Sequence, residues 1–204
     1  MSDSIAAVVV TYNRIEELKK NIDALLKQTL VPDRIFIIDN CSTDGTNEYF
    51  KDRYENVEVV RLSSNTGGSG GFAAGTKIAY ERGFDYIMLM DDDGRPRNEE
   101  TIAELMMVAQ KYANRKIMLN PLVCVNNDTL SFDLNKIRDI KEILKQSNEK
   151  IYRNGINPFN GTFLNRQLVQ EIGYPNKEFF IKGDETEYTN RARKANAVIA
   201  TVVS

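Results

Sequence analysis

The middle of the chain reads Tyr86-Ile87-Met88-Leu89-Met90-Asp91-Asp92-Asp93-Gly94, so an apolar run leads directly into three consecutive carboxylates. The run has the length and composition of a buried strand. Adjacent carboxylates repel one another and raise each other's pKa, and a divalent cation with oxygen ligands removes that penalty. The segment therefore favours a metal site at a strand end. The alternative is an acidic Asp-Gly turn that caps the next helix.

Composition restricts the classes of protein to which the chain can belong. Its 204 residues, 42% of them hydrophobic, are enough for one domain with a sizeable core. The net charge of −2 and the scattered basic residues argue against a nucleic-acid partner. The apolar run at residues 5–10 is too short to span a bilayer and lacks the flanks of a signal peptide. We therefore expect a cytoplasmic protein, free or on the cytoplasmic face of the membrane.

Histidine is absent, which excludes His-based acid–base catalysis and His-ligated zinc within this chain. The two cysteines, Cys41 and Cys124, form no Cys-x-x-Cys pattern, and we interpret them as reduced structural thiols. Chemistry must then depend on carboxylates, lysines, arginines, tyrosines or a metal ion.

Apolar runs alternate with helical patterns in the first half of the chain. Asn13 and Glu16 suggest an N-cap pair for the first helix. The alternation predicts an α/β domain whose mainly parallel sheet is covered by helices on both faces. Strands are predicted at residues 5–10, 35–38, 57–62 and 86–90, and helices at residues 14–28, 46–53 and 71–82.

The segments that follow these strands begin at Thr11, Asp39, Asn65 and Asp91, at the edge where open α/β sheets bind ligands. The third segment, residues 65–72, reads Asn-Thr-Gly-Gly-Ser-Gly-Gly-Phe and precedes a helix. Glycines let a backbone approach a ligand and a helix N-terminus donates N–H groups to phosphate, so a diphosphate is the predicted guest. The alternatives are a glycine-rich surface loop and, through Gly68-x-Gly70-x-x-Ala73, a dinucleotide-binding loop.

The pattern is looser beyond Asp93. Asp184 and Glu187 suit a helix-capping pair, and the alternative makes Asp184 or Glu185 a general base that faces the crevice. The apolar run at residues 179–181 is expected to anchor this turn to the core. Helices are predicted at residues 99–112, 166–172 and 185–194, strands at residues 117–125 and 198–203, and a flap at residues 126–157 with an amphipathic stretch at 137–144.

Taken together, five motifs resemble those of the inverting glycosyltransferases of family 2, which have the GT-A fold. The resemblance covers nearly the whole chain. The motifs are most similar to those of the galactofuranosyltransferase branch, with rhamnosyltransferases as close neighbours. It implies a Rossmann-like sheet in a single domain at residues 1–204, with a nucleotide-sugar-binding half at residues 1–95 and an acceptor-side half at residues 96–204. The motifs are Val9-Val10-Thr11-Tyr12-Asn13-Arg14, residues 38–46, Asn65-Thr66-Gly67-Gly68, Asp91-Asp92-Asp93 and Asp184-Glu185.

The resemblance also implies roles for single residues. Asp91 and Asp93 would hold Mn²⁺ or Mg²⁺ against the diphosphate, and Asp92 would contact the donor. Glu185 stands at the position of the catalytic base, with Asp184 directly before it. The residues around the nucleotide would be Thr11, Tyr12, Arg14, Asp39 near the base and ribose, Asn65, Gly67 and Gly68.

The implied reaction moves a sugar of galactofuranose or rhamnose type from a nucleotide-diphosphate donor, such as a UDP-sugar, to a cell-envelope glycan or a lipid-linked acceptor. The metal ion would neutralise the departing diphosphate while the base takes the acceptor proton, so one displacement inverts the anomeric centre. A lipid-linked acceptor would bring the enzyme to the membrane periphery. The sequence does not determine an oligomeric state.

Three features depart from the family pattern. Gly183 and residues 159–161 stand where the galactofuranosyltransferase branch usually has tryptophan. Glu185 replaces an aspartate. The family's metal-binding histidine follows a strand that corresponds to residues 198–203, and this sequence stops at Ser204, as a C-terminally truncated chain would. The alternative functions are a donor-binding module without catalysis and a dinucleotide-dependent oxidoreductase.

Overall fold

The computed structural model describes residues 3–153 and 155–203. Within them, the chain forms a large sheet of eight strands in the order β3-β2-β1-β4-β9-β5-β10-β8. Strands β8 and β9 run antiparallel to their neighbours, and the other six are parallel to one another. The mainly parallel sheet confirms the predicted α/β class. The strands are β1 (Ile5–Thr11), β2 (Arg34–Asp39), β3 (Val57–Arg61), β4 (Tyr86–Asp91), β5 (Ile117–Pro121), β8 (Ile151–Arg153), β9 (Asn160–Asn165) and β10 (Val198–Val202).

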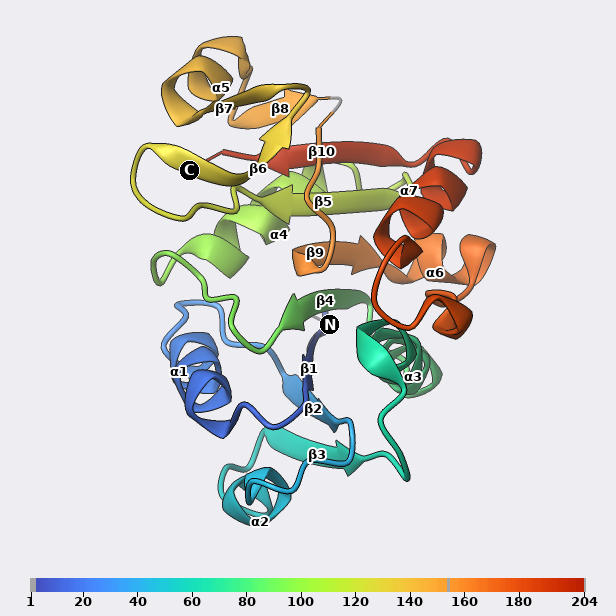
Figure 1. Cartoon of the computed structure of the whole chain (residues 1–204). Helices are drawn as coiled ribbons and strands as arrows, with labels where there is room; N and C mark the ends of the chain where they lie inside the picture. The colour runs from blue at the N-terminus through green and yellow to red at the C-terminus, as the bar shows by residue number, and fades with distance from the viewer. Residues whose placement is uncertain (1–2, 154, 204) are drawn as a thin grey trace.

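Helices cover both faces of this sheet (Figure 1). Side chains of α1, α2 and α4 belong to the hydrophobic cluster on one face, and those of α3, α6 and α7 to the cluster on the other. The helices are α1 (Ile15–Leu26), α2 (Thr46–Phe50), α3 (Gly67–Glu81), α4 (Thr101–Lys111), α5 (Ile140–Gln146), α6 (Arg166–Ile172) and α7 (Asp184–Lys194), with a 3₁₀ turn η1 (Lys177–Phe179) before α7. This three-layer arrangement is the one that the alternation predicts.

Strand β1 lies at the centre of the core and is buried along its whole length. Successive side chains of a strand point to opposite faces, so Val9 joins the cluster that contains α1, and Val8 and Val10 join the cluster that contains α3. A continuous run of apolar, mostly β-branched residues is therefore what this position requires. Burial of each such side chain stabilises the fold by about 1.5–3 kcal/mol.

The segment at residues 126–157 is the predicted flap. It contains the hairpin β6 (Thr129–Leu134) and β7 (Ile137–Asp139), followed by α5 and β8. Its apolar side chains form a small cluster around Leu134 and Ile143, which Val203 at the end of the described chain joins. In Figure 1 the flap lies at the β8 edge of the sheet. In the part of the chain that the structure describes, no helix has both the length and the apolar character needed to cross a membrane.

Several predicted boundaries need correction. Helix α3 begins at Gly67, so most of the glycine-rich segment belongs to the helix, and α2 ends at Phe50. Strand β5 ends at Pro121, and residues 137–139 of the amphipathic stretch are strand rather than helix. Strand β9, which lies between β4 and β5, is absent from the prediction.

Three local predictions are wrong. Asn13 does not cap α1, because it has a positive φ of 53° and its side chain accepts a hydrogen bond from the Thr43 N–H (2.7 Å). Asp184 does not cap α7: the N-cap is Gly183, and Glu187 pairs with Arg191 (2.8 Å). Residues 179–181 do not anchor their turn to the core, because all three side chains are exposed.

Candidate active site

The carboxylate turn follows β4 and is held by the segment that follows β1. These strands are parallel neighbours, so their carboxyl ends lie side by side. The Thr11 hydroxyl donates to Asp92 Oδ2 (2.7 Å). Arg14 Nη1 lies 3.2 Å from Asp92 Oδ1 and 3.0 Å from Asp93 Oδ2. The structure thus brings together Thr11, Arg14 and the acidic residues, as their positions at strand ends predict.

Arg14 is the protein's own counter-charge at this turn. Partial burial alone would lower the pKa of Arg14, but the charges of Asp92 and Asp93 outweigh it and raise that pKa. For Asp92, burial raises the pKa, while the Thr11 hydrogen bond and the Arg14 charge oppose the rise. Asp92 is therefore a buried, fixed member of the turn, whereas Asp93 is exposed.

Asp91 is influenced by four other carboxylates. Desolvation is the main reason that the pKa of Asp91 rises to about 7, and the charges of Asp93, Asp92, Glu185 and Asp184 add to it. The last two residues open α7, almost a hundred positions further along the chain. The carboxylates at the end of β4 and at the start of α7 therefore act on one another electrostatically. That the first group binds the metal ion and the second supplies the base stays a prediction.

Asp184 and Glu185 differ in their surroundings. Asp184 is buried, and its Oδ1 atom has no hydrogen-bond donor among the described residues. Burial and the adjacent Glu185 raise the pKa of Asp184. Glu185 is half-buried, and its Oε2 accepts a 3.3 Å hydrogen bond from the Gly183 N–H. Both carboxylates are thus at the site, and Glu185 is the more accessible of the two.

The predicted nucleotide side is a network of tied loops. Asp39 is fully buried, and its two oxygens accept from the Ser42 N–H (2.8 Å) and from Arg61 Nη1 (3.0 Å). The Asn65 side chain accepts from the Gly67 N–H (2.9 Å). Tyr12 is exposed at the surface. Both Asp39 and Asn65 form hydrogen bonds within the protein. Their direct contact with a nucleotide stays a prediction.

Sequence reasoning missed the residues that tie these loops together. Asn40 Oδ1 accepts from the Thr66 N–H (3.1 Å), and its Nδ2 donates to the Gly67 carbonyl (3.1 Å). Asn21, on α1, donates from Nδ2 to the Asp91 carbonyl (3.2 Å) and also bonds the Gly94 carbonyl. Asn40 directly follows β2, so its place at a strand end was an available signal. Asn21 lies within a helix and gave none.

The glycine-rich segment packs tightly against its neighbours. A Cβ at Gly71 would lie 2.5 Å from a Val10 methyl group, and one at Gly75 would lie 2.2 Å from Val8. Gly67 has a positive φ of 74° and abuts the Phe180 carbonyl, which also accepts from the Ser69 N–H (3.1 Å). These glycines let α3 approach β1 and the loop before α7. A diphosphate at Gly67 and Gly68 stays a prediction.

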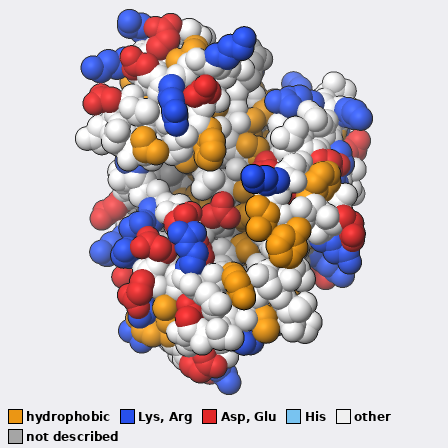
Figure 2. Space-filling model, in the orientation of Figure 1, with side chains coloured by type: hydrophobic (Ala, Val, Ile, Leu, Met, Phe, Trp, Pro, Cys, Tyr) orange, Lys and Arg blue, Asp and Glu red, His pale blue; other side chains and the backbone are white. Residues whose placement is uncertain are grey.

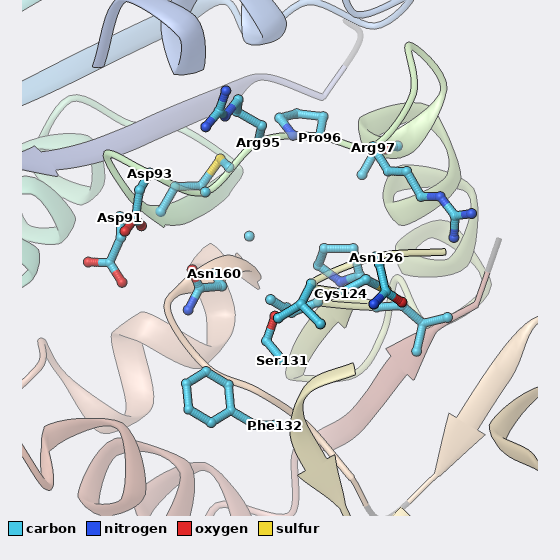
Figure 3. A pocket seen from close by; sticks show the side chains of 18 of the residues that line it. Asp91, Asp93, Arg95, Pro96, Arg97, Cys124, Asn126, Ser131, Phe132 and Asn160 are labelled. Carbon is cyan, nitrogen blue, oxygen red and sulfur yellow. The ribbon is translucent and has the colours of Figure 1, made fainter. Parts of the chain in front are cut away.

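A cavity of about 630 Å³ opens beside the carboxylate turn (Figure 3). Asp91 and Asp93 lie at one end of it, with Asn160 across from them, and Arg97 and Cys124 lie toward the other end. Part of its wall comes from the flap, including Phe132. Cys41 and Cys124 are both free and half-buried.

Asp91 and Asp93 fit a divalent cation. Their donors are hard oxygens, and the pKa of Asp91 is raised first by burial and then by four neighbouring carboxylates whose charge a cation would offset. Among residues 3–153 and 155–203, no three Cys, Asp or Glu side chains gather closely enough to enclose a metal ion by themselves. Mg²⁺ is commonly held by one or two carboxylates together with substrate phosphates and water, so a two-carboxylate set suits an ion that a diphosphate completes.

Comparison with known families identifies the class to which this domain belongs. The sequence model of glycosyl transferase family 2 matches residues 6–173, and the chain belongs to this family. The chain is 31% identical over 209 residues to the galactofuranosyltransferase GlfT1 of Mycobacterium tuberculosis. The alignment covers 98% of this chain and 68% of the relative. It is 25% identical over 198 residues to the dTDP-rhamnosyl transferase RfbF of Shigella flexneri, and that alignment covers 94% of this chain and 64% of the relative.

Solved structures show the same fold. Residues 1–349 of Staphylococcus aureus TarS superpose with a TM-score of 0.71 and 19% identity, over 98% of this chain and 58% of that one. The mannosyltransferase PcManGT of Pyrobaculum calidifontis, in complex with GDP-Man and Mn²⁺, superposes with a TM-score of 0.70 and 15% identity. The superposition covers 100% of this chain and 57% of that one. The chain thus spans under two thirds of these structures' length. The GT-A fold is confirmed, and family membership makes this a glycosyltransferase domain rather than an oxidoreductase.

Proposed function

We propose that this domain transfers a sugar from a nucleotide-diphosphate donor to a hydroxyl group of a glycan or a lipid-linked saccharide, with inversion at the anomeric carbon. One observation carries the proposal: Asp91, Asp93, Asp184 and Glu185 come from distant parts of the chain and form one electrostatic site. The relatives named as galactofuranosyl- and rhamnosyltransferases support a sugar of one of these types. UDP and dTDP are the nucleotides to test first.

Each residue has a distinct part in this proposal. Arg14 and Thr11 bind on the donor side of the turn, where the half-exposed Arg14 side chain is accessible to a ligand. Glu185 accepts the proton of the attacking hydroxyl, since it is more accessible than Asp184. Asp184 lies directly before Glu185 and keeps a second carboxyl group beside the base. No protein nucleophile takes part, because a single displacement inverts the configuration.

Asp91 and Asp93 would hold Mn²⁺ or Mg²⁺, which when bound supplies positive charge to the leaving diphosphate. Residues 1–95 would then form the nucleotide-sugar half, and residues 96–204, with the flap, the acceptor side. We place the domain in the cytoplasm, in the synthesis of a cell-envelope polysaccharide.

Calorimetric titration of UDP, with Mn²⁺ and again with EDTA, tests the proposal. Binding is expected with the metal ion and should be lost with EDTA and in Asp93→Ala. The matched control is Asp23→Ala, which removes an exposed carboxylate on α1 and should bind as the parent does. If UDP, dTDP and GDP all fail to bind in both conditions, the proposal is wrong for this chain.

A further inference from the structure

Exposed apolar side chains gather around the mouth of the crevice. Among the described residues, nine large hydrophobic side chains are exposed, and six of them, with exposed fractions from 39% to 64%, belong to segments that line or adjoin this site. Figure 2 shows hydrophobic side chains on both sides of a central hollow that has acidic side chains beside it. We call these six residues the apolar rim: Tyr12, Val125, Phe132, Phe179, Phe180 and Ile181.

The rim residues come from three parts of the chain: two of them line the cavity, and the others belong to segments that directly adjoin site residues. Val125 and Phe132 line the cavity that ends at Asp91 and Asp93. Tyr12 lies between the two residues that contact the acidic turn. Residues 179–181 directly precede the carboxylates of α7. Because separate segments bring apolar side chains to one opening, the rim is a surface feature and not the exposed end of a single element.

The backbone holds the loop at residues 179–181 with its side chains outward. Phe180 has a positive φ of 62°, a conformation that is uncommon for a bulky residue. Its carbonyl accepts from the Ser69 N–H (3.1 Å), and the Ser69 hydroxyl donates to the Asn176 carbonyl (2.6 Å). A Cβ at Gly67 would come within 2.1 Å of the Phe180 oxygen, so glycine is needed there. The backbone of this loop is thus held against the start of α3, and its three side chains are 39% to 60% exposed.

Positive charges flank the apolar residues. In the sequence Lys177 and Lys182 flank the 179–181 run, and Arg97 lines the same cavity as Val125 and Phe132. All three are exposed, and within the described residues none of them pairs with a carboxylate, although Glu178 lies in the same loop. Apolar and aromatic side chains with adjacent basic residues are the combination that binds at a bilayer interface, where the rings enter the headgroup region and the cations meet lipid phosphates.

We propose that the apolar rim docks this domain on an anionic bilayer surface. Phe180, Ile181 and Phe132 enter the interface, and Lys177, Lys182 and Arg97 contact phosphate groups of the lipids. Docking in this orientation turns the open cavity toward the membrane. It requires neither donor nor metal ion, so it can be tested separately from the transfer reaction.

The absence of tryptophan from the chain permits a direct test. Single-tryptophan variants Phe180→Trp and Phe132→Trp report insertion against no tryptophan background. Met107→Trp is the control, because Met107 is also exposed but lies on α4 outside the rim. The vesicles contain brominated phosphatidylcholine with about 30% phosphatidylglycerol, which gives the anionic surface that basic residues recognise.

Bromine is expected to quench the fluorescence of the Phe180→Trp and Phe132→Trp variants and to leave that of Met107→Trp unquenched. The proposal is overturned if no variant is quenched, or if the Met107→Trp variant is quenched as strongly as the other two. A blue shift of the Phe180→Trp emission that grows with protein concentration in the absence of vesicles would show that a second copy of the chain covers the rim, and this too would overturn it.

Sedimentation of the unlabelled chain with the same vesicles gives an independent readout. Phe180→Ser with Ile181→Ser, and separately Lys177→Glu with Lys182→Glu, should each lower the bound fraction severalfold. The matched control is Leu144→Ser, which removes an exposed apolar side chain of α5 that lies outside the rim. An equal loss in the control, or equal binding to vesicles of phosphatidylcholine alone, would contradict the proposal.

Discussion

Arg14 occupies the place where the acidic turn needs a cation. Its Nη1 lies within 3.2 Å of both Asp92 and Asp93, so a metal ion at Asp93 must compete with the guanidinium group. Arg14→Ala should therefore strengthen Mn²⁺ binding in the absence of nucleotide by about two- to fivefold, because an exposed ion pair contributes about 0.2–1 kcal/mol. The same variant should weaken UDP binding. Calorimetry with Mn²⁺ alone measures the first effect.

The matched variant is Arg95→Ala, which removes a nearby guanidinium that pairs with Glu17 (2.7 Å) rather than with the acidic turn. It should leave Mn²⁺ affinity unchanged. Weaker Mn²⁺ binding by Arg14→Ala would show that Arg14 supports the site instead of competing for it.

Asp91 makes the stability of the metal-free protein depend on pH. Its pKa is about 7 in the folded chain and about 3.8 when unfolded, so the folded state retains a proton between these values. The free energy of unfolding should therefore fall as the pH rises from about 4 to about 7, by an amount on the order of 2–4 kcal/mol. Asp91→Asn removes this loss, so in EDTA it should resist urea better than the parent at pH 8, with a smaller advantage at pH 5.

Asp23→Asn serves as the comparison. It replaces an exposed carboxylate, so the variant should have the same urea midpoint as the parent at both pH values. An Asp91→Asn advantage of equal size at both pH values would mean that the charge of Asp91 is not the cause.

Glu185 should separate donor binding from transfer. Glu185→Gln keeps the size of the side chain and removes its proton affinity, so UDP should bind as in the parent while sugar transfer falls by about 10²–10⁴-fold. Glu187→Gln is the matched control, because Glu187 is in the same first turn of α7 and pairs with Arg191. Calorimetry measures UDP binding, and a transfer assay with a sugar donor of the nucleotide that binds measures catalysis. If Asp184→Asn abolishes transfer and Glu185→Gln does not, Asp184 is the base.

At the scale of elements, α3 depends on glycine for its approach to β1. A Cβ at position 75 would lie 2.2 Å from a Val8 methyl group and 3.0 Å from Ile38. Gly75→Ala should therefore destabilise the protein by about 1–3 kcal/mol, the usual cost of overpacking, although alanine favours helix. Gly68→Ala is the control, because its Cβ would meet nothing nearer than 4.0 Å. Urea unfolding measures both; equal midpoints would mean that the helix shifts without cost.

The sequence predicts elements best where local pattern and tertiary position agree. Strands β1, β2 and β4 are continuous apolar runs, and each is buried almost throughout. Strand β9 has a polar start, Asn160-Gly161-Thr162, and its burial depends on a distant partner: the Thr162 hydroxyl donates to Asn120 Oδ1 (2.9 Å). No pattern within β9 reports that contact. The predicted start of α3 is wrong for a related reason, because its glycines signal a loop while packing against β1 and Phe180 sets a helix.

The candidate site divides in the same way. The convergence of Thr11, Asp91 and Asp93 follows from strand ends in a parallel sheet, which the apolar runs predict. The contacts of Asn21 and Asn40 could not be predicted, although Asn40 stands at a strand end, since each side chain joins segments that are far apart in the chain. Their roles depend on how far apart these segments lie in the fold, and composition does not determine that distance.

At the scale of the whole molecule, the two halves share one sheet. Leu164 of β9 pairs with Ile87 of β4 on one side and with Met118 of β5 on the other, so β9 joins residues 1–95 to the remainder. Its side chain is fully buried. The chain should therefore unfold in one cooperative transition, even if the proposed nucleotide and acceptor halves have separate roles.

Leu164→Ala tests whether the chain unfolds as one cooperative unit. The variant leaves a cavity at the junction and should lower the free energy of unfolding by about 2–5 kcal/mol. Because both halves depend on β9, far-UV circular dichroism and tyrosine fluorescence should shift together to a lower urea midpoint. Leu144→Ala removes an exposed leucine and should shift neither signal. Two separate transitions in the variant, one near the parental midpoint, would show that one half folds without the other and that the shared sheet does not couple them.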